Sequence, residues 1–253
     1  EAGAVRWSWS PDDDPCVDAS HRPWFDHLDE ALPSRGGGHL LVTASGGAAA
    51  AVSTSRGRVD WYGLVGGNPH AIETLPDERV VVASSTGSTL STFAWPGPVG
   101  YTPLLDLCRH ALDDAHAVRW DPARETLWAL GGRHLQARTA GLGLRAEYVL
   151  PCAPCHDAPG GHDLAFIPGS PALLLSAESG VWSFDRDLRT FAPFAPLAFT
   201  PHVKSLGTGP RPLYLSATES WWSDTVRTWS DPRWTRRLPG ARFYKARWLP
   251  RPD

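Results

Sequence analysis

The chain has 253 residues, of which 42% are hydrophobic and 20% are charged, and its formal net charge is −3. This length and apolar content suffice for one large all-β domain or two small ones. Because the net charge is small and the Lys and Arg residues are scattered, nucleic acid is not expected as a partner, and the absence of any run of about 18 apolar residues predicts no membrane span.

Short runs of β-forming residues, separated by Gly, Pro, Asp and Ser, occupy most of the sequence, which holds 24 Gly, 24 Pro and 13 Trp. This punctuation indicates an all-β protein. The first residues, EAGAVRWSWSP, have no basic start and no apolar stretch, so they contain no signal peptide. We expect a secreted or periplasmic protein from which a leader has been removed.

A seven-residue segment recurs at intervals of about 43 residues, over 27–33, 70–76, 116–122, 162–168, 202–208 and 244–250. The first five segments begin with histidine and the sixth begins with tyrosine: His27, His70, His116, His162, His202 and Tyr244. Each of the first five is followed by a second apolar run that ends in small residues, at 40–45, 80–85, 126–131, 173–178 and 213–218. A period of this length with four short strands per unit is typical of a β-propeller blade.

The repeat therefore predicts one six-bladed β-propeller over residues 1–253, with four-stranded blades. The sixth unit offers only residues 242–248 at one end of the chain and 4–10 at the other, so we expect the termini to share an incomplete closing blade. Either this closing blade is small or, as we expect from the usual blade length, about 25 further residues precede residue 1. A five-bladed ring with irregular ends is the structural alternative.

The first strand of each propeller blade lines the central channel, so the repeated histidines are expected at one mouth of it. Neutral imidazoles there would bind a divalent transition metal, and charged ones an anion. We predict metal ligation by His70, His116, His162 and His202; the donors suit Zn, Mn, Fe, Cu or Ni without choosing among them. The alternative is that the histidines only form hydrogen bonds between blades.

Charged residues on the same strands extend this prediction. Glu73 and Asp163 are candidates for orienting metal-bound histidines, and Arg119 is a candidate for holding substrate charge. The candidate bases are His27, Lys204, Tyr244 and Lys245. Ion pairs between blades are an equally open interpretation of these charges.

Cys152-Ala-Pro-Cys155-His156 matches the attachment pattern of a c-type haem. The surrounding Pro- and Gly-rich loop and the absence of Met disfavour haem, leaving a local disulfide or a second metal site. Cys16 and Cys108 would form a disulfide only in an exported protein. The pairs Trp7/Trp9 and Trp221/Trp222 are expected in blade packing, with stacking on sugar rings as the alternative.

Several segments, including WSWSP (7–11), GGNPHAIETLPD (66–77), AHAVRWDP (115–122) and LPGARFYKARW (238–248), resemble a family of bacterial secreted six-bladed propellers of unknown function. The resemblance spans nearly the whole chain and implies further strands before residue 7. In histidine geometry rather than sequence, the chain also resembles oligogalacturonate lyases and carotenoid oxygenases, propellers that hold a metal with blade histidines.

Together these features favour a metal-dependent carbohydrate-active enzyme, preferably a lyase for sugars that contain uronic acids. The metal would bind the substrate carboxylate and acidify the neighbouring proton. The alternatives are a His-ligated iron or copper oxygenase and a non-enzymatic propeller that binds a sugar or a protein partner. We expect a monomer with a small-molecule or oligosaccharide ligand.

Overall fold

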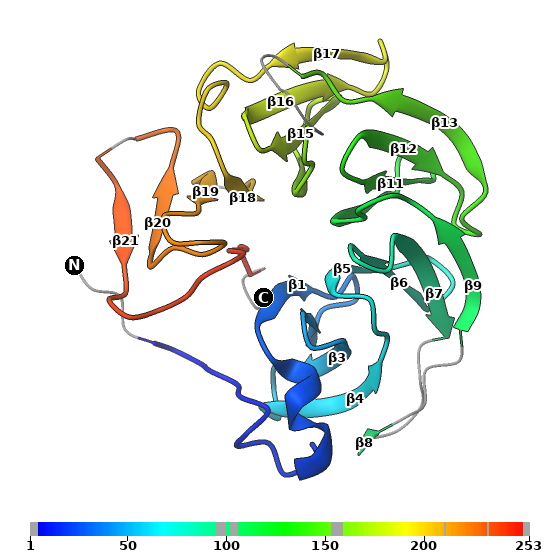
Figure 1. Ribbon diagram of the computed structural model, residues 1–253, viewed down its shortest axis with the longest axis vertical. Helices are drawn as coiled ribbons and strands as arrows, with labels where there is room; N and C mark the ends of the chain where they lie inside the picture. The colour runs from blue at the N-terminus through cyan, green and yellow to red at the C-terminus, as the bar shows by residue number, and fades with distance from the viewer. Residues whose placement is uncertain are drawn as a thin grey trace. The chain divides into compact units, whose positions relative to one another are not determined.

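The computed structural model describes residues 5–94, 100–101, 106–152, 159–209, 211–231 and 233–249. Within these ranges the chain forms five β-sheets and one short 3-10 helix, η1 (Ala19–Phe25) (Figure 1). None of the described helical segments has the length and apolar character needed to cross a membrane.

The strands of each sheet follow one another in chain order, apart from β8, which pairs in parallel with β4. The first sheet comprises β1 (Leu28–Pro33), β2 (His39–Ala44), β3 (Ala48–Ser53), β4 (Arg58–Leu64) and β8 (Gly100–Tyr101). The second comprises β5 (Pro69–Thr74), β6 (Arg79–Ser84), β7 (Thr89–Ala94) and β9 (Asp106–Ala111). The third comprises β10 (Ala117–Asp121), β11 (Thr126–Leu130), β12 (His134–Arg138) and β13 (Leu144–Val149). The fourth comprises β14 (Asp163–Phe166), β15 (Ala172–Ala177), β16 (Gly180–Asp185) and β17 (Thr190–Pro193). The fifth comprises β18 (Val203–Gly207), β19 (Leu213–Ser216), β20 (Thr225–Thr228) and β21 (Thr235–Arg237).

Each sheet contains four antiparallel strands in chain order, to which β8 is added in the first, and these sheets are the blades of a β-propeller, which confirms the predicted fold class. The chain divides into two compact units. The larger unit (Val5–Gly131 and Leu135–Glu147) contains the first three sheets, apart from the ends of β12 and β13. The smaller unit (Gly132–His134 and Tyr148–Trp248) contains the fourth and fifth sheets.

The predicted count of six blades is wrong, because the structure has five. Residues 5–10 form no strand, and residues 242–248 contribute only an isolated bridge between Ser223 and Phe243. At Ala246 the backbone bonds instead to a side chain: Ser205 Oγ lies 3.0 Å from its N and 3.2 Å from its O. Because the Ser205 side chain satisfies both backbone groups of Ala246, this residue forms with the other described residues no backbone hydrogen bonds of the kind that would pair it with another strand in a sixth blade.

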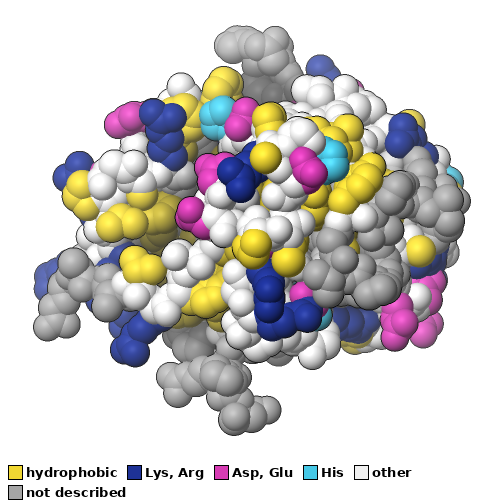
Figure 2. Space-filling model, turned by 90° about the horizontal axis from the view of Figure 1, so that it is seen from below, with side chains coloured by type: hydrophobic (Ala, Val, Ile, Leu, Met, Phe, Trp, Pro, Cys, Tyr) yellow, Lys and Arg dark blue, Asp and Glu magenta, His cyan; other side chains and the backbone are white. Residues whose placement is uncertain are grey.

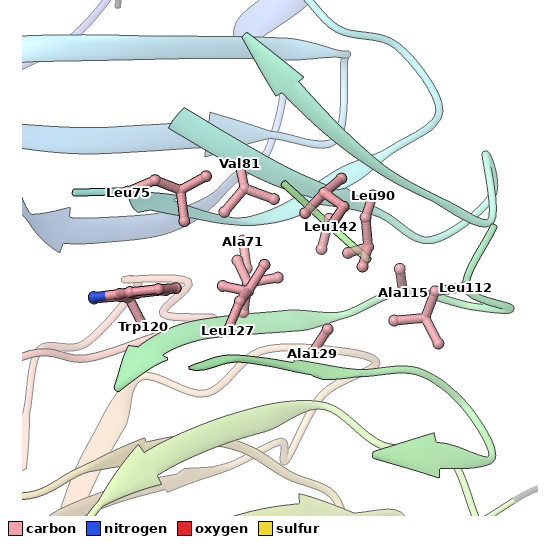
Figure 3. Packing of buried hydrophobic residues seen from close by; sticks show 12 residues of the cluster. Ala71, Leu75, Val81, Leu90, Leu112, Ala115, Trp120, Leu127, Ala129 and Leu142 are labelled. Atoms are coloured by element: carbon pink, nitrogen blue, oxygen red, sulfur yellow. The ribbon is translucent and has the colours of Figure 1, made fainter. Parts of the chain in front are cut away.

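The second strands of the first four sheets are buried on both faces, as their apolar sequences predicted, whereas in β19 buried and partly exposed residues alternate. Every residue of β11 is buried, as are five of the six in β6 and in β15. In the larger unit, a 12-residue cluster fills the space between the second and third sheets (Figure 3). There Ala71 lies beside Leu127, so a small residue admits a large one from the facing sheet. Burial of each large apolar side chain contributes about 1.5–3 kcal/mol.

On the face drawn in Figure 2, Lys and Arg side chains are interspersed with Asp and Glu. This face therefore carries no extended field of one sign of the kind that steers nucleic acid.

Candidate functional site

The first strand of every sheet begins with the same backbone conformation. A residue with a positive φ angle precedes each strand: His27 (56°), Asn68 (57°), Asp114 (49°), Gly160 (65°) and His202 (54°). The side chain two residues later is polar and buried in all five sheets, at Asp29, His70, His116, His162 and Lys204. These five residues occupy equivalent positions, which we call the buried lead positions.

The histidines of the first and fifth sheets lie outside this register. His27 and His202 are exposed and themselves have the positive φ angle, so the buried lead positions in their sheets are Asp29 and Lys204. A bulge in β1 and another in β18 interrupt the pairing at these two buried residues. A bulge lies at His70 in β5 as well, so the bulge accompanies the buried lead position and does not distinguish these two sheets. The difference is that His27 and His202 lie two residues before that position, which matching histidine to histidine conceals.

Glu178, which directly follows β15, gathers three of the predicted site residues in the smaller unit. Its Oε1 lies 2.5 Å from His162 Nε2 and 2.8 Å from Lys204 Nζ. Its Oε2 lies 2.6 Å from His202 Nδ1. We call His162, Glu178, His202 and Lys204 the Glu178 cluster.

The cluster holds Glu178 in its ionised form. The hydrogen bond from His162 is the largest cause that lowers the pKa of Glu178 far below its ordinary value, and the Lys204 ammonium acts in the same direction. Partial burial of the carboxyl opposes both. The carboxylate therefore stays charged throughout the neutral range.

Protons within the cluster are shared. Lys204 Nζ lies 2.6 Å from His162 Nε2, so one of these nitrogens must donate and the other must accept. His162 Nε2 can donate to Glu178 or accept from Lys204, but it cannot do both at once. The two arrangements differ by the position of one proton, as suits a site for acid–base chemistry.

His202 is the accessible member of the cluster. Its side chain is 59% exposed, whereas those of His162 and Lys204 are only 10% and 4% exposed. When Nδ1–H donates to Glu178, the lone pair on Nε2 is directed away from the carboxylate and can accept a proton.

Glu178 is the member that sequence reasoning missed, although the sequence carries a signal for it. The second apolar runs of the other four sheets end in a small residue, at Ser45, Ser85, Gly131 and Thr218. Only the run 173–178 ends in a charged one. A lone carboxylate at a position otherwise kept small marks a special role.

The other two predicted ligands, His70 and His116, lie together in the larger unit. Their rings stack with centroids 4.4 Å apart and planes 11° apart. His70 Nδ1 lies 3.5 Å from Asp29 Oδ1, and His116 Nδ1 lies 2.9 Å from the Asp114 carbonyl. A metal lies in the plane of each imidazole that binds it, so these stacked rings do not converge on one ion.

No group of three or more His, Cys, Asp or Glu residues has metal-holding geometry within the parts of the chain that the structure describes. His162 and His202 are brought together by Glu178, and His70 and His116 contact each other. Metal binding by these four histidines stays a prediction.

Arg119 and Glu73 belong to a buried charged group in the larger unit. Arg119 Nη2 lies 3.3 Å from Glu30 Oε2, so the guanidinium forms an ion pair between the first and third sheets. Burial raises the pKa of Glu73, and the charge of Arg119 only partly opposes this. These contacts match the interpretation of the strand charges as ion pairs between blades.

Asp163 fastens the C-terminal segment to the fourth sheet. Its fully buried carboxylate accepts two hydrogen bonds from Arg247, at 2.7 and 2.8 Å, and a third from the Leu206 backbone. Lys245 Nζ lies 3.8 Å from the same carboxylate and 5.9 Å from the centroid of the Tyr244 ring. Asp163 and Lys245 thus form a contact that holds the C-terminal segment in place.

The cysteines divide into two kinds. Cys16 and Cys108 are free, so the pairing considered for them is not formed. Cys152 is disulfide-bonded. Cys155 and His156, which complete the haem-like pattern, lie outside the described residues.

The fold and the buried lead positions define a β-propeller of five blades whose first strands begin with polar, hydrogen-bonded side chains. The chain belongs to the DUF6528 family, described as a family of unknown function, whose model matches residues 1–251. This confirms the expected membership of a propeller family of unknown function, with five blades in place of six.

Among solved structures, the chain is similar to "Kuenenia stuttgartiensis Hydrazine Synthase", with a TM-score of 0.57 and 11% sequence identity. The similarity covers 86% of this chain and 61% of that one, so the present chain spans less than two thirds of it. At this identity the likeness shows the fold alone. No curated protein matches the sequence.

Proposed function

We propose that this propeller is a carbohydrate-active enzyme of the lyase type, acting on sugars that contain uronic acids, with His202 as its general base. Glu178 is the positioning residue for that base. Lys204 and His162 keep Glu178 ionised and in place. The proposal concerns the Glu178 cluster, all of whose members lie in the smaller unit.

The observation that carries the proposal is the contact between Glu178 Oε2 and His202 Nδ1, at 2.6 Å, on an imidazole that is 59% exposed. A carboxylate that accepts from Nδ1–H fixes the tautomer whose Nε2 is basic and raises its basicity. An imidazole is suited to this role because its ordinary pKa lies near neutral pH.

In the proposed reaction, His202 Nε2 removes the proton from the uronate carbon next to the carboxylate. The electron pair of that C–H bond forms a carbon–carbon double bond, and the bond from the adjacent carbon to the glycosidic oxygen breaks. Water supplies a proton to the departing oxygen. The products are a shortened sugar and a sugar with an unsaturated uronate at its new end, and no oxidant or reductant is consumed.

A divalent transition metal is the second form of this proposal, and it requires the side chains of the cluster to move, because no three such donors have metal-holding geometry within the described residues. Two imidazoles and one carboxylate form a ligand set suited to Zn, Mn or Fe(II). His162, His202 and Glu178 would be those ligands. The Lys204 ammonium, 2.6 Å from His162 Nε2, would have to lose its proton or move, because it competes with the metal for that nitrogen.

The test is an ultraviolet assay for the conjugated product on polygalacturonate, alginate and glucuronan, with added divalent metals and with a chelator. We expect the wild-type protein to release product, and His202→Ala and Glu178→Gln to reduce kcat by at least about 100-fold. His39→Ala is the matched control, because His39 also pairs with a carboxylate, Asp60, at 2.7 Å.

Absence of product from all three polymers under both metal conditions would refute the lyase. Product formed equally well by His202→Ala would refute the assignment of the base. Activity abolished by the chelator and restored by one metal would select the metal-dependent form.

A further inference from the structure

An exposed aromatic pair follows β19 in the smaller unit. Trp221 is 65% exposed and packs edge-on against Trp222, with ring centroids 6.2 Å apart. Most exposed apolar side chains need no explanation, but tryptophan is the largest of them and leaving it in water is costly. The surroundings of this pair show that it is held in place.

The loop that carries Trp221 is fixed by its own backbone. The Thr218 and Glu219 amides donate to the Trp222 carbonyl, at 3.0 and 3.1 Å, and the Trp222 amide donates to the Glu219 carbonyl at 3.1 Å. Ser220 completes the tight turn with a positive φ of 52°. A rigid turn presents the indole of Trp221 with little conformational entropy to lose on binding.

A guanidinium lies on the same aromatic pair. The Cζ atom of Arg242 is 4.8 Å from the centroid of the Trp222 ring. Two hydrogen bonds between Ser223 and Phe243, at 2.9 and 3.0 Å, hold the segment that bears Arg242 beside this loop. Within the described part of the chain, no carboxylate lies at ion-pair distance from Arg242.

This group lies at the same end of the fifth sheet as His202. The Ala217 amide donates to the His202 carbonyl at 3.0 Å, and Ser216 Oγ donates to the Pro201 carbonyl at 2.8 Å. Trp221 is four residues beyond Ala217, so its backbone is at most about 14 Å away. That reach suits neighbouring residues of one oligosaccharide.

We infer that Trp221, Trp222 and Arg242 form a binding subsite for a uronic-acid residue of the oligosaccharide. The apolar face of the pyranose ring stacks on the Trp221 indole, as sugars commonly do on flat aromatic surfaces. The sugar carboxylate pairs with the planar guanidinium of Arg242, which the stacking on Trp222 orients for a bidentate contact. This inference rests on the proposed function for its substrate class and adds the residues that select acidic over neutral sugars.

The experiment measures binding by calorimetry in the His202→Ala background, where the proposed base is absent and the probe is not consumed. The probes are trisaccharides of galacturonate, glucuronate and mannuronate, with a galactose trisaccharide as the neutral comparison. We expect one uronate probe to bind, and Trp221→Ala and Arg242→Ala each to weaken it about tenfold or more. Arg242→Lys should weaken binding less, because lysine keeps the positive charge and loses only the planar guanidinium that makes two parallel hydrogen bonds.

The fifth sheet supplies matched controls. Arg236 stacks on Trp234 with the same 4.8 Å separation, so Arg236→Ala and Trp234→Ala remove an equivalent pair elsewhere and should leave the affinity unchanged. Equal affinity for the neutral probe, unchanged affinity in both Trp221→Ala and Arg242→Ala, or no binding of any uronate probe would overturn the subsite. Binding as expected without release of unsaturated product refutes the lyase and leaves the subsite standing.

Discussion

Lys204 Nζ lies 2.6 Å from His162 Nε2, and the two side chains come from equivalent positions of consecutive first strands. Lys204 lies two residues after the positive-φ residue His202, as His162 lies two residues after Gly160. The contact makes Lys204 part of the polar cluster around Glu178. It also makes the lysine a second group, after His162, that keeps the carboxylate ionised.

Replacing Lys204 with Met should lower the free energy of unfolding by about 1–3 kcal/mol at neutral pH, because one buried and one partly buried hydrogen bond lose the ammonium. Urea unfolding followed by tryptophan fluorescence measures this. Lys204→Arg keeps the charge and should cost less. Equal stability of Lys204→Met and the wild type would contradict the contact.

Glu178 should make the protein more stable above its ordinary pKa than below it. The native state lowers the pKa of Glu178, so its stabilising contribution is present above pH 4.5 and is lost progressively as the pH falls further. Glu178→Gln should therefore flatten the acid limb of a plot of unfolding free energy against pH. Glu219→Gln, at an exposed loop residue, is the control and should leave the limb intact.

Glu73 should act in the opposite direction. Burial raises its pKa in the folded protein, so the contribution is fully present below pH 4.5 and is lost as the pH rises through the folded-state value. Glu73→Gln should be more stable than the wild type at neutral and alkaline pH, by about 1.4 kcal/mol for each unit by which the pKa is raised. Thermal unfolding at several pH values measures the difference.

A comparison with Glu30 sharpens this test. Glu30→Gln removes the carboxylate that pairs with Arg119, so it should destabilise the protein at neutral pH. If both variants lost stability equally at alkaline pH, the raised pKa of Glu73 would be contradicted.

Asp163→Asn should destabilise the protein by about 3–5 kcal/mol, because it leaves the Arg247 and Lys245 cations without their buried carboxylate. A double-mutant cycle with Arg247→Met isolates the pair, and the double variant should lose less than the sum of the two single losses. Additive losses would mean that the bidentate contact does not couple the C-terminal segment to β14.

Much of the architecture could be predicted from the sequence, because the repeated segments mark the start of each blade. The five second strands fall within one or two residues of the predicted runs, since three apolar residues between turn-forming residues leave few alternatives. The predicted sixth blade does not form, and the periodicity of the sequence gives no sign of this. Residues 244–250 keep the pattern of a first strand, yet Ser205 Oγ satisfies the backbone of Ala246.

Three of the four members of the candidate site were predicted from the sequence, whereas Glu178 and the geometry of the site were not. His162, His202 and Lys204 stood out by residue type and spacing, and the structure brings them onto one carboxylate. Arg119 and Asp163 stood out equally, but their partners Glu30 and Arg247 come from other strands and make them ion pairs. Which charged residue faces which partner depends on the pairing of distant segments, and one sequence does not fix that.

The repeated histidine is therefore the feature for which the prediction from sequence and the structure differ. The sequence by itself determined that a histidine lies at or within a few residues of the start of each of the five blades, because the turns and apolar runs that mark a blade are local patterns. The tertiary structure decided which side chain occupies the buried lead position. In the first and fifth sheets the positive-φ residue that starts the strand is itself the histidine, so the buried positions two residues later are Asp29 and Lys204, and His27 and His202 are exposed. Where a first strand starts depends on its register with the second strand, and the recurrence of a residue type does not set that register.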